Sequence, residues 1–282
     1  MSKVFYITGS SSGLGEDLVR NLSSRGHQVI ATARSITKIE HLKQLSNVRV
    51  QQLDISDSTE TLKQKVDEAI SFFGRIDVLV NNAGYGQSGC FEEVSMDEIR
   101  KQFETNVFGT VNLTQVFLPY FRSTATESKI CTVTSGAGTV AFPTSTAYSA
   151  SKFALEGFFE NLDAELRASQ IPVQVLIVAP GVFKTNFVDN MVKPDAEIGA
   201  YADLKHKINT FLQGISESGG DCSIGAKLIA DALLGEGFAE GKTVPLRLPI
   251  GSDSVAQLVG KYRRELEVTE AWKPFAAESD AK

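Results

Sequence analysis

The segment VFYITGSSSGLG, residues 4–15, is the most informative about the fold of this chain. An apolar run at 4–7 leads into a turn that contains Gly9, Gly13 and Gly15, and the turn opens a helical pattern at 14–24. Glycine lets a backbone approach a ligand closely, and a helix N-terminus offers unpaired N–H groups with partial positive charge. A strand, a glycine turn and a helix in this order predict a site for a dinucleotide pyrophosphate, with a plain turn as the alternative.

Similar apolar runs recur further along the chain, and longer amphipathic segments separate them. The runs are nearly continuous and rich in β-branched residues, which is typical of strands that are covered on both faces of a parallel sheet. The intervals are long enough for the helices that parallel strands need as connections. We therefore predict an α/β fold in a single domain spanning residues 1–282. The runs are QVIATA at 28–33, VRVQQL at 48–53, DVLV at 77–80, KICTVTS at 129–135 and VQVLIVA at 173–179.

The pattern loosens beyond Pro180. Residues 182–222 mix aromatic and polar side chains without a clean period, and we interpret them as a substrate cap. One more helix at about 223–235 and one more strand at about 242–248 are expected, followed by a tail at 250–282 that carries Tyr262 and Trp272.

Composition excludes several classes of function. The net charge of −6 and the pI near 5.3 argue against a nucleic-acid or anionic-membrane surface. Three distant cysteines, Cys90, Cys131 and Cys222, support neither a disulfide framework nor a metal site. No run approaches the length of a membrane span, and no signal peptide is recognisable, so a cytoplasmic protein is expected.

The residues that follow the second strand bear on the choice of dinucleotide. Ala33 stands where a carboxylate would accept hydrogen bonds from the ribose of NAD, and Arg34 follows it. A guanidinium suits the 2′-phosphate of NADP, with Ser11 or Ser12 as extra donors. We therefore expect NADP(H) to be favoured over NAD(H), and the alternative is that Arg34 is a solvated charge at a helix start.

Polar and small residues also follow the next two strands. Asp54 is placed to reach an adenine amino group, although an aspartate before a helix is also an ordinary N-cap. Asn81, Asn82, Ala83 and Gly84 permit the close approach of a ligand at a strand end, or they merely shape the turn.

The candidate reacting residues are Ser135, at the end of a strand, and Tyr148 and Lys152 in YSASK. A spacing of four puts the phenol and the ammonium on one helical face, which the apolar stripe of this helix turns toward the sheet. A cation that lowers the phenol pKa from about 10 to about 7–8 would make Tyr148 an acid and base near neutrality. Tyr201 and Lys205 share this spacing, so the pair alone proves little. Tyr148 differs from Tyr201 in having a serine at the preceding strand end and small residues before its lysine.

Taken together, these motifs resemble the short-chain dehydrogenase/reductase family. The resemblance covers residues 4 to about 185 in the expected order. It rests on TGSSSGLG, Asp54, NNAG at 81–84, Asn106 in ETNVFG, Ser135, YSASK and APG at 179–181.

The resemblance implies a doubly wound, Rossmann-like sheet and an NADP(H)-dependent oxidoreductase that interconverts a ketone or aldehyde and an alcohol. In its catalytic tetrad, Ser135 orients the carbonyl and Tyr148 transfers the proton. Lys152 lowers the tyrosine pKa and holds the nicotinamide ribose, and Asn106 positions a water. Val182 and Thr185 are expected to contact the nicotinamide carboxamide. The full set of expected cofactor contacts is Gly9, Ser11, Ser12, Gly13, Leu14, Gly15, Arg34, Asp54, Ile55, Asn82, Ala83, Gly84, Tyr148, Lys152, Pro180, Gly181, Val182 and Thr185.

Substrate and assembly are less well determined by the sequence. Tyr85, Phe142 and Phe183 are expected to wall a pocket for a moderately hydrophobic carbonyl or alcohol, or simply to pack the cap.

Many relatives pair through helices that correspond to about 97–122 and 148–169, so a homodimer or homotetramer is expected unless the tail covers that surface. Phe153 is either a subunit contact or a lone exposed residue. Two rival readings are a dinucleotide-binding redox sensor or scaffold without catalysis, and an epimerase or dehydratase acting on nucleotide-sugars.

Overall fold

A seven-stranded parallel sheet organises the chain, in the order β3-β2-β1-β4-β5-β6-β7. The computed structural model describes residues 2–124 and 127–280, without the side chains of residues 215–217. The order of the strands reverses between β1 and β4, and in doubly wound sheets a ligand crevice opens at such a point. The strands are β1 (Val4–Ile7), β2 (Gln28–Ala33), β3 (Val48–Gln52), β4 (Val78–Asn81), β5 (Ser128–Val133), β6 (Val173–Pro180) and β7 (Arg247–Ile250).

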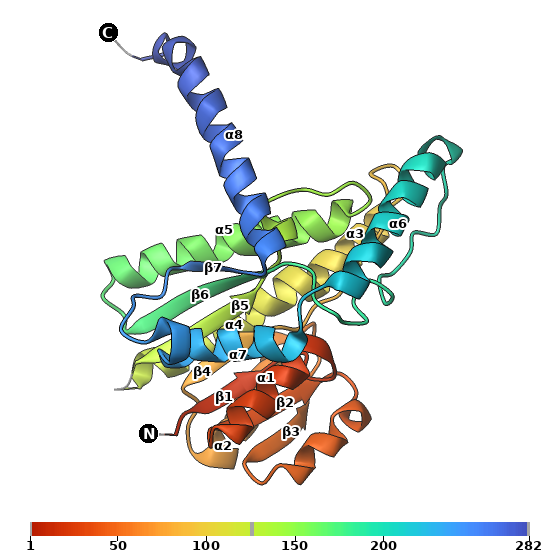
Figure 1. Cartoon of the computed structure of the whole chain (residues 1–282). Helices are drawn as coiled ribbons and strands as arrows, with labels where there is room; N and C mark the ends of the chain where they lie inside the picture. The colour runs from red at the N-terminus through yellow and green to blue at the C-terminus, as the bar shows by residue number, and fades with distance from the viewer. Residues whose placement is uncertain (1, 125–126, 281–282) are drawn as a thin grey trace.

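Helices cover both faces of the sheet (Figure 1). Alternate residues of β1 point to opposite sides, so Phe5 and Ile7 join the core under α1 and α7, and Val4 and Tyr6 join the core under α2, α4 and α5. This two-sided burial explains why the strands are apolar throughout. The helices are α1 (Gly13–Ser24), α2 (Thr59–Phe73), α3 (Met96–Phe103), α4 (Thr110–Ser123), α5 (Thr146–Ala168), α6 (Ala202–Ser218), α7 (Cys222–Leu234) and α8 (Ser252–Ala277).

Short helical turns complete the chain, and one of them lies in the middle of a long helix. Residues Glu104–Gly109 form a π-helical segment between α3 and α4, and this segment carries Asn106. Such segments often occur at functional sites. The remaining turns are 3-10 helices at Ile36–Lys38, Glu40–Gln44, Gly136–Gly138, Gly199–Tyr201 and Gly237–Ala239.

The last strand and the tail differ from the prediction. The strand expected at 242–248 is β7 at Arg247–Ile250, because Gly241 has a positive φ of 69° and the Lys242 N–H closes a turn onto the Ala239 carbonyl. The tail forms α8, which projects from the body of the molecule (Figure 1). It leaves Phe158 of α5 and Phe108 of the segment before α4 exposed, while its Lys261 lies over the ring of Phe153 on α5.

The cap region also contains more regular structure than its sequence suggests, since residues 202–218 form α6. Within the described residues, no helix has the length and the apolar composition needed to cross a bilayer.

Candidate active site

The glycine turn lies between β1 and α1 and is too tight for side chains. Gly9 and Gly13 have φ values of +67° and +57°, which other residues rarely adopt. A Cβ on Gly9 would lie 2.8 Å from the Ala83 Cα, and one on Gly15 would overlap the Gly9 carbonyl oxygen. Ser12 caps α1 without a side-chain hydrogen bond, which leaves the N–H groups of the first turn available to an anion. The turn therefore has the close backbone approach and the free N–H groups that a pyrophosphate site needs.

The NNAG segment joins the glycine turn to the candidate reacting residues. The Asn82 and Ala83 N–H groups donate to the Thr8 Oγ1 at 3.0 and 2.9 Å, and the Asn82 side chain donates to the Thr8 and Gly9 carbonyls. Asn82 thus shapes the turn. A Cβ on Gly84 would lie 3.2 Å from the Asn106 Oδ1 and 3.7 Å from the Lys152 Nζ, so Gly84 borders two of the candidate catalytic residues.

The adenosine side is open and carries a cation. Arg34 is exposed, and among the ion pairs between described residues none involves it. The Asp54 Oδ1 accepts the Ser56 N–H and hydroxyl at 3.0 and 2.6 Å, and Ile55 beside it is buried. The N-cap of α2 is Ser58, so the alternative that Asp54 is an N-cap is wrong.

The tetrad residues meet at the carboxyl end of β5. Tyr148 is half-buried, and its hydroxyl interacts with the Ser135 side chain. Lys152 lies one turn later on α5, is 5% exposed, and has its Nζ 5.9 Å from the centroid of the Tyr148 ring. The ammonium donates to the Val133 carbonyl at 2.9 Å. Ser135, Tyr148 and Lys152 are brought together as the sequence predicted.

The pKa values in this site differ from the expectation. Burial raises the pKa of Tyr148 to about 12, and the hydrogen bond with Ser135 opposes this shift only in part. Burial also lowers the pKa of Lys152 to about 8, while the Glu156 carboxylate opposes that change. Desolvation of the phenolate thus dominates the Tyr148 pKa in this structure, and the lowering of that pKa by Lys152 stays a prediction.

Most of the hydrogen-bonding capacity of the Asn106 side chain is used by neighbouring residues of the site. Its Oδ1 accepts the Tyr85 N–H at 3.1 Å, and its Nδ2 donates to the Tyr85 carbonyl at 2.9 Å and to the Ser151 Oγ at 3.2 Å. Both protons of the amide nitrogen are thus committed. For a water, the side chain retains only acceptor capacity on Oδ1.

The segment after β6 runs from the glycine turn toward Tyr148. A Cβ on Gly13 would lie 3.1 Å from the Thr185 Cγ2, and the ring centroid of Phe187 is 5.3 Å from that of Tyr148. The Val182 N–H donates to the Asp253 Oδ2 at 2.8 Å. Any contact between Val182 and a carboxamide must therefore use another atom of Val182, or displace Asp253.

Several residues of α8 brace this site, and no motif in the sequence indicated them. Besides the bond from Val182 to Asp253, the Ser254 Oγ donates to the Ala179 carbonyl at 2.8 Å, and the Lys261 Nζ donates to the Thr139 carbonyl at 2.7 Å. A side chain on Gly181 would overlap the Asp253 carboxylate, which explains the glycine after Pro180. The first turns of α8 thus hold the loops that follow β5 and β6.

The cap residues divide into two groups. Phe183 packs into the core beside Gly220 and Gly225. This position favours the alternative that Phe183 is a packing residue over the expectation that it walls a substrate pocket. Phe187 and Met191 instead close over Gly86, next to Tyr148. Tyr85 and Phe142 are half-buried.

The second Tyr-x-x-x-Lys pair lies apart from the tetrad. The Tyr201 hydroxyl donates to Glu92, and the Lys205 Nζ forms an ion pair with Glu93 at 2.7 Å. These contacts tie α6 to the segment before α3. The repeated spacing is therefore structural at this second position.

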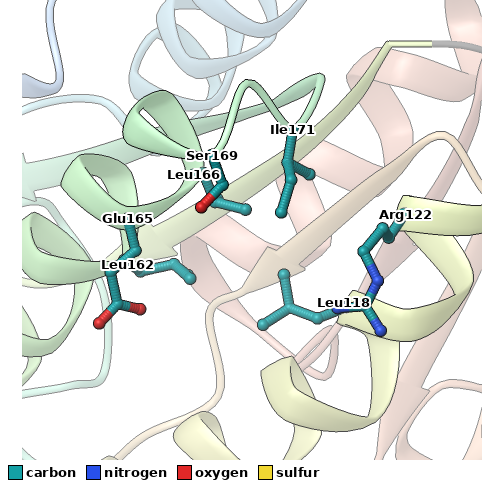
Figure 2. A pocket seen from close by; sticks show the side chains of 7 residues that line it. All are labelled: Leu118, Arg122, Leu162, Glu165, Leu166, Ser169 and Ile171. Carbon is teal, nitrogen blue, oxygen red and sulfur yellow. The ribbon is translucent and has the colours of Figure 1, made fainter.

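Figure 2 shows a groove between α4 and α5. It is lined by Leu118 and Arg122 from α4 and by Leu162, Leu166 and Ser169 from the end of α5, whereas Tyr148 lies at the beginning of α5. A second groove beside it includes Phe158. Both grooves lie on the outer surface and are separate from the candidate catalytic residues.

Comparison with known proteins agrees with this geometry. The family model for short chain dehydrogenases matches residues 3–196. An uncharacterized oxidoreductase of Bacillus subtilis is 36% identical over 238 residues, which are 80% of this chain and 83% of that protein. A 3-ketodihydrosphingosine reductase of Bacteroides thetaiotaomicron is 39% identical over 188 residues, which are 67% of this chain and 66% of that protein.

Solved structures share the fold over nearly the whole chain. A short-chain dehydrogenase from Streptomyces avermitilis superposes with a TM-score of 0.87 at 32% identity, covering 99% of this chain and 98% of that one. A short chain dehydrogenase from Burkholderia cenocepacia, solved in complex with NADP, gives a TM-score of 0.70 at 26% identity and covers 95% and 96% of the two chains. With the family model matching more than half of its residues, the chain belongs to the short chain dehydrogenase family of oxidoreductases.

Proposed function

We propose that this protein is an NADP(H)-dependent oxidoreductase that interconverts a ketone or aldehyde and an alcohol, with Tyr148 as the general acid and base. The observation that carries the proposal is the continuity of the site. Asn82 bonds to the Gly9 carbonyl of the glycine turn, and a Cβ on Gly84 would lie 3.7 Å from the Lys152 Nζ. The hydroxyl of Tyr148 is paired with Ser135 at the end of this path. A bound nicotinamide dinucleotide supplies or accepts the hydride.

The residues of the chain supply the proton and the electrostatic stabilisation. Ser135 and Tyr148 offer two hydroxyl groups to one carbonyl oxygen, and such donors stabilise the negative charge that grows on it in the transition state. With its pKa raised to about 12, Tyr148 is protonated at neutral pH. It is therefore available as a proton donor to the carbonyl oxygen.

The substrate is proposed to be a moderately hydrophobic ketone or aldehyde. Phe187 packs against the Tyr148 ring, and Met191 closes the same wall, so the group beside the reacting carbonyl meets apolar atoms. The similarity to a 3-ketodihydrosphingosine reductase supports a ketone.

A substrate screen tests this function directly. Ketones and aldehydes of increasing chain length are supplied with NADPH and NADH in parallel, and nucleotide oxidation is followed at 340 nm. NADPH consumption with ketones is expected. Dinucleotide binding without turnover of any carbonyl would contradict catalysis and favour a sensor or scaffold.

Arg34 is proposed to select NADP(H). An Arg34→Ala variant is expected to bind NADPH about tenfold more weakly, the equivalent of one lost charge-assisted hydrogen bond, with NADH affinity nearly unchanged. Fluorescence titration with each nucleotide measures both affinities. Lys38→Ala, which removes another exposed cation of the same turn region, is the control. Equal losses for NADPH and NADH in Arg34→Ala would contradict the assignment.

The outer faces of α4 and α5 are proposed to pair two or four copies of the chain, in a cytosolic setting. Phe158 is 48% exposed and lines a groove with Leu118 and Leu162. A charge placed there should dissociate the assembly, because it would be buried without a partner. Phe158→Asp is expected to reduce the mass measured by light scattering, and Phe238→Asp, at an exposed site far along the chain, is not. An unchanged mass in Phe158→Asp would rule out this surface.

A further inference from the structure

Glu156 is a buried carboxylate that the proposed mechanism does not use. It lies one turn after Lys152 on α5 and is 6% exposed. Its Oε1 accepts the Thr134 hydroxyl at 2.6 Å, and its Oε2 accepts the Arg247 Nε at 2.7 Å. A carboxylate is retained in such a place only when it is paired and hydrogen-bonded.

The surroundings of Lys152 are otherwise short of negative charge. Its ammonium donates to the Val133 carbonyl and faces the ring of Tyr148, and Gly84 borders it on the side of Asn106. All of these groups are neutral at pH 7. A buried ammonium is costly without a counter-charge, and Glu156 is the carboxylate that raises the pKa of Lys152 against the effect of burial.

The charged groups behind Glu156 come from two further elements. Arg247 on β7 bridges Glu156 to the half-exposed Glu160, and Tyr262 of α8 faces Arg247. Lys261 of α8 adds a cation near the ring of Phe153, which projects from α5 two residues before Leu155. Among these charged groups, Glu156 is the carboxylate that follows Lys152 by four residues on α5. Residues four apart on a helix are neighbours on one face.

The loop after β5 packs on the turn of α5 that joins Lys152 to Glu156. A Cβ on Gly138 would lie 3.1 Å from the Glu156 Cγ and 3.2 Å from the Lys152 carbonyl oxygen, so the loop after β5 lies directly on this turn of α5. The loop shields the turn from solvent, and electrostatic interactions are stronger where water is excluded.

We propose that Glu156 is a positioning residue of the active site, the counter-charge that keeps Lys152 an ammonium, with Thr134 and Arg247 orienting its carboxylate. Its effect on catalysis rests on the proposed function. Its effect on the protonation of Lys152 does not.

Glu156→Gln tests the proposal because it preserves the shape and the acceptor for Thr134 while removing the charge. Lys152 is charged below its pKa, so losing the anion lowers the pH at which the ammonium deprotonates. Glu160→Gln is the matched control, since it also removes a carboxylate partner of Arg247 but lies two turns from Lys152 and is half-exposed.

The direct measurement is an NMR titration of lysine labelled with ¹³C at Cε, in the full chain without nucleotide, with Lys152 assigned by a Lys152→Arg variant. We expect Lys152 to titrate about one pH unit or more lower in Glu156→Gln than in wild type, and at the wild-type pH in Glu160→Gln. An unchanged Lys152 pKa in folded Glu156→Gln would overturn the proposal.

Two further measurements keep the outcome decisive. If Glu156→Gln fails to fold, Arg247→Gln is the second variant, because it removes the cation that is paired with Glu156. It should raise the Lys152 pKa, and a lowered or unchanged Lys152 pKa would overturn the proposal. In the pH profile of kcat/KM, the basic limb should move down in Glu156→Gln and stay in Glu160→Gln. A shifted titration in a chain that turns over no carbonyl would sink the proposed function alone, whereas turnover with an unshifted titration would sink the role of Glu156 alone.

Discussion

Replacing Tyr148 with phenylalanine is expected to lower kcat by at least about a hundredfold, while the affinity for NADPH stays within about twofold. The variant keeps the ring that packs on Phe187 and loses only the hydroxyl that bonds to Ser135. A lost proton donor affects the transition state, whereas nucleotide binding depends on the glycine turn. Steady-state kinetics and fluorescence titration measure the two quantities separately.

Tyr201→Phe is the control for this variant, because it removes a hydroxyl from the same Tyr-x-x-x-Lys spacing. The Tyr201 hydroxyl donates to Glu92 on the protein surface, so a loss of kcat below about fivefold is expected. Near-native turnover in Tyr148→Phe, or a comparable loss in Tyr201→Phe, would show that Tyr148 is not the proton donor.

The sequence predicts best those features that depend on neighbours along the chain. The alternation of β-branched runs and amphipathic segments predicted the parallel sheet, and six of the seven strands lie close to their predicted positions. The spacing of Tyr148 and Lys152 predicted a shared helical face for the same reason, since four residues make about one helical turn. These features could be predicted because periodicity is a local property.

Features that depend on tertiary contacts were not predictable in this way. Asp253 reaches the Val182 N–H across 71 residues of sequence, and nothing in the pattern of either segment indicates the contact. Helix spacing reports the ammonium near Tyr148 but not the burial of the phenol, which raises the Tyr148 pKa in this structure. The α6 helix was missed although Leu204, Ile208 and Phe211 follow a helical period, because the polar residues and glycines around them obscured this local signal.

Gly15→Ala is expected to weaken NADPH binding by at least about tenfold and to lower the free energy of unfolding by about 1–3 kcal/mol. The backbone of Gly15 has an ordinary φ, so the effect comes from space alone. The new methyl group would overlap the Gly9 carbonyl oxygen and lie 2.5 Å from the Asn82 Nδ2. Asn82 is itself bonded to the Thr8 and Gly9 carbonyls, so neither neighbour can move without opening the turn.

Gly157→Ala provides the matched control, because a Cβ at this position in α5 meets no described atom within 4 Å. It should leave binding unchanged and stabilise the helix by up to about 1 kcal/mol. Chemical denaturation and fluorescence titration with NADPH compare the two variants. If Gly15→Ala bound NADPH as tightly as Gly157→Ala does, the nucleotide would not use the tight turn at the start of α1. The path from that turn through Asn82 and Gly84 to Tyr148 would then have to be abandoned as the dinucleotide site.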